Sequence, residues 1–302
     1  MAANSLTNAA AEATEMFFHT LGNTASSWRD WAGVINADAA SLKRADISGI
    51  NAYDEAGDSD TAEANNALSS SASTTTVKGW EKLVTVTELE VNNTPGILTD
   101  IAGQMAEAAA HSIAARVYST LAGLNATAHP DTSIKDESAG AANFCDTFDS
   151  TNSSQKNLYT GALTRANLST MLEGVAGYKN KAGLEMNLQQ YPLQMIVPVE
   201  LATTAIDILG LDGPTYDGTS LASGSFGARI AGLTVAPYLS DANDFFITTT
   251  GARCPLKVWV RNAPSIRVTP SPSSGRVHLY GYGEWEIVLE PSEAGMFMAV
   301  VS

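Results

Sequence analysis

Three features of the sequence predict an α+β fold. Apolar residues recur every three or four positions from residue 95 to residue 124, which is the period of an α-helix. Helical and strand patterns then alternate over residues 158–250, as in a mixed sheet flanked by helices. From residue 253 onward, β-branched and aromatic residues are enriched, which favours strands.

The helix predicted over residues 95–124 is expected to be the axis of the molecule. Thr94 can act as its N-cap, and Pro95 suits the first helical position. At 1.5 Å per residue it would form a rod of roughly 42 Å, whereas globular helices average about a dozen residues. A long core helix in an ordinary α+β domain would show the same stripe. The expected inward stripe is Ile97, Leu98, Ile101, Met105, Ala109, Ile113, Val117, Leu121 and Leu124.

Composition excludes several classes of protein. The 17 Lys and Arg residues against 32 Asp and Glu residues give a net charge of −15, which argues against a nucleic-acid binder. There is no run of apolar residues long enough to span a membrane, and the first residues lack the basic region of a signal peptide. Cys145 and Cys254 form no CxxC motif, so we expect free thiols made in a reducing cytoplasm.

Residues 1–50 have the character of an arm more than of a domain. Residues 6–22 predict a short amphipathic helix, with Leu6, Ala10, Ala13, Phe17 and Leu21 facing inward. Trp28 and Trp31 follow, and these large aromatic side chains need a surface to pack on, in this subunit or in a neighbour.

The acidic residues Asp54, Glu55 and Asp58 lie in a stretch with no nearby basic residue. Residues 51–76 offer little apolar surface to offset the entropy of ordering, so they are expected to form a flexible loop when alone. From Lys78 to Val91 the pattern alternates as in a β-strand that leads into the long helix. An extended β-hairpin is the expected structure, with a plain linker as the alternative.

The second half of the chain gives clear element boundaries. After a loop-like stretch over residues 125–157, a helix is predicted from Thr164, which can cap it. Residues 193–197 are typical of a buried strand, and Pro198 opens a helix that stops at Gly210. Strands are predicted around residues 229–250, and several more follow to the end of the chain.

Motifs for catalysis and metal binding are missing from the sequence. The four histidines are scattered without the spacing of a metal site. The segment SGSFG does not match the GxSxG motif, and GYGEWE lacks the third glycine of GxGxxG. We therefore expect no enzyme, no cofactor and no metal site.

The order of segments resembles a known family. GWEKLVTVTELEVNNTPGI precedes the long helix, and LYTGALTRANLSTMLEGVAGYKNKAGLEMNLQQYPLQMIVPVELATTAIDIL follows it. Over roughly residues 78–290 this arrangement is similar to major capsid proteins of tailed bacteriophages, in particular to the Mu-type major head subunit family. These are packing signatures and carry no chemistry, so their specificity comes from the ordered set.

The resemblance implies the Hong Kong 97-type capsid fold. Its parts would be an N-terminal arm (1–50), an extended loop (51–92), a spine helix with the first part of the peripheral domain (93–157), an axial domain (158–252) and the remaining peripheral strands (253–302). It also implies a structural protein of the virion, assembled in the cytoplasm of the bacterial host. Hexamers and pentamers would form an icosahedral shell around double-stranded DNA without sequence-specific binding.

The partners that the resemblance implies are further copies of the chain, a portal protein, a separate scaffolding protein and, in some relatives, a decoration protein. The scaffold is expected to be separate because the chain has no room for a cleaved scaffolding region. An encapsulin-type compartment of the same fold is one alternative, and a secreted or surface binding module is another. The residues expected at subunit contacts are Trp28, Trp31, Asp54, Glu55, Asp58, Lys78, Trp80 and Lys82.

Overall fold

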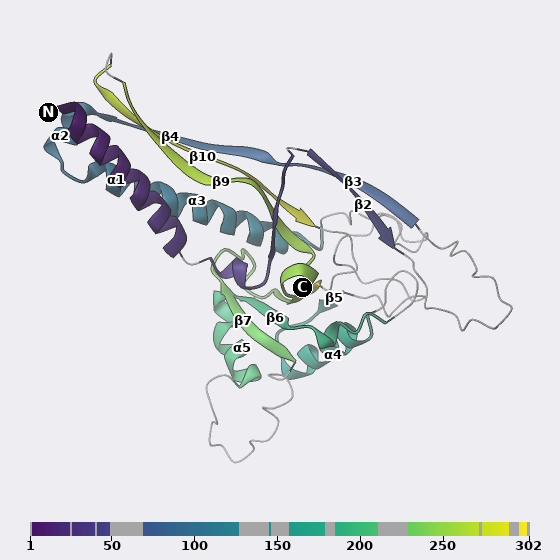
Figure 1. Cartoon of the computed structure of the whole chain (residues 1–302). Coiled ribbons are helices and arrows are strands. Elements are labelled where there is room, and N and C mark those ends of the chain that lie inside the picture. Colours follow the sequence, from purple (N-terminus) through teal and green to yellow (C-terminus); the bar gives the residue numbers. More distant parts are fainter. Residues whose placement is uncertain are drawn as a thin grey trace.

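The computed structural model describes residues 2–24, 26–39, 41–48, 69–126, 145, 157–178, 185–210, 229–271, 274–289 and 296–300. The helices are α1 (Ala2–Asn23), α2 (Glu88–Asn93), α3 (Ile97–Ala122), α4 (Arg165–Ala176) and α5 (Ala202–Leu209). The strands are β1 (Gly33–Asn36), β2 (Ser41–Ser48), β3 (Ser69–Thr76), β4 (Lys78–Thr87), β5 (Leu158–Thr160), β6 (Leu193–Pro198), β7 (Ile230–Ala236), β8 (Phe245–Thr249), β9 (Leu256–Ser271), β10 (Arg276–Leu289) and β11 (Met296–Val300). Figure 1 shows an elongated part, where long strands run beside α1 and α3, and a second part with shorter strands and helices.

The elongated part is built on a sheet with the strand order β1-β9-β10-β4. Strands β9 and β10 form a long antiparallel pair, β4 pairs antiparallel with β10, and β1 pairs parallel with β9. One face of this sheet packs on α1 and the first half of α3. That core contains, among others, Phe17, Leu98, Met105, Val277 and Leu279. The α+β class predicted from the sequence is confirmed.

The long helix α3 confirms the predicted stripe but not the predicted start. Of the nine stripe positions, Leu98, Met105, Ile113, Val117, Leu121 and Leu124 are buried, and the other three are half-buried. Thr94 does not cap this helix, because it ends α2 instead. Gly96 occupies the N-cap with φ of 87°, a left-handed conformation that suits glycine, and so α3 begins at Ile97.

The strand that leads into α3 is shorter than predicted. It ends at Thr87, where the Thr87 side chain accepts a hydrogen bond from the Glu90 backbone N–H and the Glu90 carboxylate accepts one from the Thr87 N–H. This reciprocal cap starts helix α2, so residues 88–91 are helical and not extended. The cap also explains the lowered pKa of Glu90, since the two Thr87 hydrogen bonds favour its charged form.

The second part is built on a mixed sheet with the order β5-β11-β8-β6-β7. The predicted helix caps are found here, with the Thr164 hydroxyl accepting from the Asn167 N–H and Gly210 ending α5 at φ of 69°. All six residues of β6 are buried, as its apolar sequence predicts. A core lies on each face of this sheet, so it is covered on both sides.

The last strand of the chain belongs to the five-stranded sheet. Residues 253–302 were expected to contribute strands to the peripheral domain only, but β11 lies between β5 and β8 in the five-stranded sheet. Its side chains alternate, so that Met296 and Met298 enter one core while Phe297 and Ala299 enter the other. Pairing across such sequence distances is not encoded in the local pattern of a strand.

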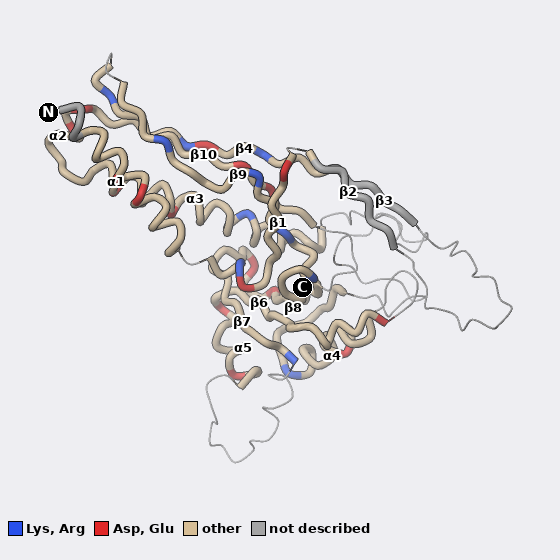
Figure 2. The backbone as a smooth tube through the Cα atoms, in the orientation of Figure 1, with Lys and Arg blue, Asp and Glu red and all other residues tan. Residues whose placement is uncertain are grey.

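Two strands form a hairpin here, and the first of them lies within residues 1–50, which were expected to be the N-terminal arm. β2 pairs antiparallel with β3 from Ser41–Thr76 to Ser48–Ser69, and the acidic residues Asp54, Glu55 and Asp58 lie outside the described residues. Figure 1 shows this pair projecting beyond the end of the long sheet, in continuation of β4. Basic and acidic residues are interspersed along β4, β9 and β10 (Figure 2).

Candidate functional site

The base of the hairpin, where β3 passes into β4, is fixed to the long sheet by two tryptophans. Trp80 on β4 stacks on Trp285 of β10, with ring centroids 4.6 Å apart and an angle of 14° between the rings. The Trp80 Nε1–H also donates to the Trp285 carbonyl at 3.0 Å. The Arg116 guanidinium of α3 lies 5.3 Å from the centre of the Trp80 ring, so helix and sheet meet at this aromatic pair.

A buried carboxylate completes this junction. Glu286 on β10 is 8% exposed. One of its oxygens lies 3.0 Å from the Lys78 ammonium, and the other lies 3.5 Å from Nε of Arg116. The two cations come from the first residue of β4 and from α3, so one carboxylate links the hairpin base, the spine helix and the sheet. A carboxylate this buried is costly unless charged partners accompany it.

The face of the long sheet that points away from α3 carries exposed apolar and aromatic side chains. Leu83 on β4 lies directly opposite Tyr280 on β10, and these side chains are 58% and 36% exposed. Tyr280 stacks on Tyr282, with centroids 6.3 Å apart. This outer face, defined by Leu83, Tyr280 and Tyr282, has no cover in the described part of the subunit.

Acidic side chains order the tyrosines of the outer face. The Tyr280 hydroxyl donates to the Glu81 carboxylate at 2.6 Å, and the Tyr282 hydroxyl donates to Glu284. These hydrogen bonds to carboxylates raise the pKa of both phenols, so they remain neutral donors at physiological pH. Glu284 is held in turn by Arg261 at 3.1 Å.

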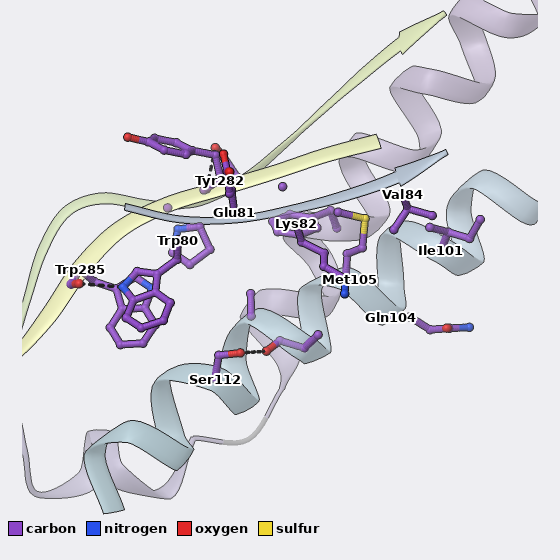
Figure 3. Close-up of a pocket in the computed structure, with 17 residues that line it drawn as sticks. Trp80, Glu81, Lys82, Val84, Ile101, Gln104, Met105, Ser112, Tyr282 and Trp285 are labelled. Atoms are coloured by element: carbon purple, nitrogen blue, oxygen red, sulfur yellow. Dashed lines mark hydrogen bonds between the residues drawn. The ribbon is translucent and has the colours of Figure 1, made fainter. Parts of the chain in front are cut away.

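An apolar groove lies on the opposite face of the sheet, between β4, β10 and α3. It has a volume of about 480 Å³. Figure 3 shows Lys82 and Met105 between β4 and the helix, with the stacked tryptophans Trp80 and Trp285 at one end. Glu81 and Tyr282 project from the other side of the strands in the same view.

The predicted contact residues that the structure describes fall in two different environments. Lys78, Trp80 and Lys82 lie together along β4, at the hairpin base and the groove. Trp28 and Trp31 are 3% and 0% exposed within the core of their own subunit, which leaves them no surface for a neighbour. The sequence left that choice open, and the structure supplies the packing partner in the form of α3 and the five-stranded sheet.

Sequence reasoning missed the partners that lie far away along the chain. Arg116, Trp285 and Glu286 are central to the junction, and Leu83 and Tyr280 to the outer face. In the sequence alone, Glu286 cannot be told apart from the solvent-exposed residues that alternate with apolar ones along β10. The only signal is the pair of glycines before it, Gly281 and Gly283, which mark a close approach of backbone and neighbour.

Chemical sites are not found in the described part of the chain. No three His, Cys, Asp or Glu side chains there are grouped so that they could hold a metal ion. No helix among these residues is long and apolar enough to cross a membrane. Cys145 and Cys254 are both buried, and no disulfide joins them.

Comparison with protein families decides the relationship. The family model described as phage capsid protein matches residues 70–288, which include β4, α3 and most strands of the two larger sheets. The chain belongs to the phage capsid protein family. This family consists of structural proteins of the shell, and the capsid protein described here shares that general role.

Solved structures show the same fold at low sequence identity. The capsid of a native GTA particle is 14% identical, with a TM-score of 0.59 over 91% of this chain and 89% of that one. The mature capsid of bacteriophage PhiM1 is 10% identical, with a TM-score of 0.57 over 91% and 86%. A virus-like particle from Pyrococcus furiosus is 12% identical, with a TM-score of 0.50 over 95% and 97%. The expected Hong Kong 97-type fold is therefore confirmed. A search among curated proteins gave no significant match.

Proposed function

We propose that this capsid protein is the major head subunit of a tailed phage of the Mu type. It assembles into hexamers and pentamers of an icosahedral shell that encloses double-stranded DNA. The β2–β3 hairpin carries the proposal. In the described part of the chain, these strands pair only with each other, and an isolated two-stranded hairpin is marginally stable in water. A projection of this kind gains its stability by lying on another subunit.

The outer face of the long sheet is the surface that we propose for this contact. Leu83 and Tyr280 offer apolar area, and Arg267 lies beside Tyr280 in the sheet register. Neither Arg267 nor Arg276, on the same face, forms an ion pair with the residues that the structure describes. The acidic residues Asp54, Glu55, Asp58, Asp60 and Glu63 of the extended loop complement two unpaired arginines on a neighbour.

The parts of the subunit take the roles that the family resemblance assigns. Residues 1–50 are the N-terminal arm, 51–92 the extended loop, 93–157 with the strands after 253 the peripheral domain, and 158–252 the axial domain. Strand β11 is transferred to the axial domain, because it pairs with β8. We propose a portal protein and a separate scaffolding protein as partners, a decoration protein as an addition on the outside, and assembly in the cytoplasm of the bacterial host.

The net charge of −15 favours containment of DNA without tight binding by the shell. The high charge also opposes unspecific association of free subunits, so assembly depends on many specific contacts repeated around rings.

Expression of the chain alone and with its scaffold tests the proposal. Light scattering and negative-stain microscopy of the purified protein are expected to show closed particles or capsomers. A monomer that persists at micromolar concentration in both preparations would contradict the capsid role.

A closed compartment of the encapsulin type is the second candidate. It is favoured by the match to the Pyrococcus furiosus virus-like particle, which covers nearly all of both chains. Nucleic-acid content separates the two, since particles isolated from infected cells carry DNA in the first case and protein cargo in the second. A gene for a portal protein beside the gene for this chain also favours the phage head.

A further inference from the structure

Short residues contribute to both walls of the groove on the inner face of the sheet. Along β10 the inward positions after Leu279 are Gly281 and Gly283, so backbone forms this part of the floor. The facing wall, from α3, presents Ala108, Ala109 and Ser112. A strand and a helix that pack side by side normally fill this space with large side chains.

The lining of the groove is mainly apolar and includes one cation. Trp80, Met105 and Trp285 are its largest apolar contributors, and the exposed Lys82 lies beside them (Figure 3). The neighbouring carboxylate, Glu81, accepts a hydrogen bond from Tyr280 on the other face. Lys82 forms no ion pair with any residue in the described ranges. A volume of about 480 Å³ lies within the usual range of ligand pockets, roughly 300–1,000 Å³. The occupant that fits is an apolar side chain next to a carboxylate.

An apolar side chain next to carboxylates is present on helix α2 of the same subunit. Leu89 on α2 is 69% exposed, the largest exposure among the large apolar side chains that the structure describes. Glu88 and Glu90 flank it in the sequence, and the cap between Thr87 and Glu90 holds this turn in place. Figure 1 places α2 at the opposite end of β4 from the hairpin, at the tip of the elongated part.

We propose that Leu89 of one subunit enters the groove of a neighbouring subunit, with its flanking glutamates beside Lys82. The inference rests on the proposed shell function. A protruding side chain and its pocket on different parts of one chain make a heterologous contact, which repeats from each subunit to the next. Burial of an exposed leucine and pairing of an unpaired lysine both favour this contact.

Cross-linking between two single variants tests the contact directly. Subunits carrying Leu89→Cys are co-assembled with subunits carrying Ala109→Cys, and the particles are oxidised. A covalent dimer is expected from this pair. The natural cysteines stay in place, since both are fully buried. The matched control pairs Leu89→Cys with Val199→Cys, whose parent side chain is 54% exposed on the other part of the subunit. Equal dimer yields from both pairs, or no dimer from the first, overturn the proposal.

Substitution at the two surfaces gives an independent readout. Leu89→Asp is expected to reduce the yield of closed shells at least tenfold, whereas Val199→Asp leaves it unchanged. Ala109→Phe fills the groove and is expected to act like Leu89→Asp, with the subunit fold checked by circular dichroism. Normal shells from Leu89→Asp overturn the proposal and leave the capsid role intact. If Ala109→Phe prevents shell formation with a preserved subunit fold while Leu89→Asp forms normal shells, the groove binds a different partner. That result also overturns the proposal. Absence of shells from the unaltered chain overturns both.

Discussion

The Glu286 carboxylate on β10 lies 3.0 Å from the Lys78 ammonium at the start of β4. Lys78 is only two residues beyond Thr76, the end of the hairpin strand β3. With Arg116 on the other carboxylate oxygen, this contact joins the projecting hairpin to the spine helix α3. The direction of the hairpin is therefore set within the subunit, before any neighbour is met.

Removal of the Glu286 charge is expected to weaken the junction. Glu286→Gln should lower the free energy of unfolding by about 1–2 kcal/mol, less than for a fully buried pair, because both cations are partly exposed and regain water. Urea unfolding followed by tryptophan fluorescence measures the loss. Glu284→Gln is the matched control on the same strand, since Glu284 is held by Arg261 and does not touch α3. Equal losses from both variants would show that the junction has no special role.

The stacked tryptophans lead to a second prediction. Trp80→Ala removes the ring between Trp285 and Arg116 and should cost about 2–3 kcal/mol, because Trp80 is only half-buried. Trp80→Phe keeps a ring in the stack but loses the hydrogen bond to the Trp285 carbonyl, at a cost of about 1 kcal/mol. Thermal unfolding of the three proteins tests this order, and a larger loss from Phe than from Ala would contradict it.

Shortening the hairpin is expected to separate folding from assembly. Replacement of residues 49–68 by an Asn-Gly turn is expected to leave the three cores of the described residues and the spine helix unchanged, because the new turn joins Ser48 to Ser69, the last pair of the hairpin. Far-UV circular dichroism should keep its helical signal, while shells should fail to close or should break at moderate temperature. High salt should weaken the unaltered shell more than the shortened one, since the acidic loop contributes screened contacts. If the shortened chain forms shells with normal resistance to heat and salt, residues 49–68 act only as a linker.

Alkaline pH is expected to destabilise the subunit through its buried acids. Burial raises the pKa of the Cys254 thiol from 9.0 to about 11 and that of Tyr159 from 10.0 to about 12. An acid with a raised folded pKa stabilises the fold fully below its unfolded pKa, and the stabilisation is lost as the pH rises toward the folded value. Stability should therefore fall from about pH 9 to about pH 12, by about 2–3 kcal/mol from Cys254.

The variants Cys254→Ala and Tyr159→Phe test this pH dependence one group at a time. Each variant should reduce part of the fall in the free energy of unfolding with rising pH. Cys254→Ala should act mainly below about pH 11, and Tyr159→Phe above about pH 10. The unfolding midpoint in urea at a series of pH values gives the slope. A decline that is identical in the unaltered chain and in both variants would assign it to other groups.

Local patterns in the sequence were sufficient for most single elements. The stripe of α3, the cap at Thr164 and the buried strand β6 depend on residues close in sequence, and the structure confirms each. The predicted start of α3 was wrong because a threonine followed by a proline is compatible both with the first residues of a helix and with the end of the preceding helix. The left-handed Gly96 decides between them, and its conformation is set by the turn between α2 and α3.

Long-range pairing could not be predicted in the same way. Trp80 and Trp285 are separated by 205 residues, and nothing around either one specifies the other. The groove has the same origin, because it requires Gly281 and Ala109 to face each other across two elements. Identification of the family was easier than identification of contacts, since an ordered set of packing segments persists when the individual partners are not visible.

Strand β11 has a consequence for the timing of biosynthesis. Met296 and Met298 complete one core, and Phe297 and Ala299 complete the other. Neither core can close on the ribosome before residue 300 has been translated and released from the exit tunnel. A chain that ends before β11 is therefore expected to leave both of these cores open.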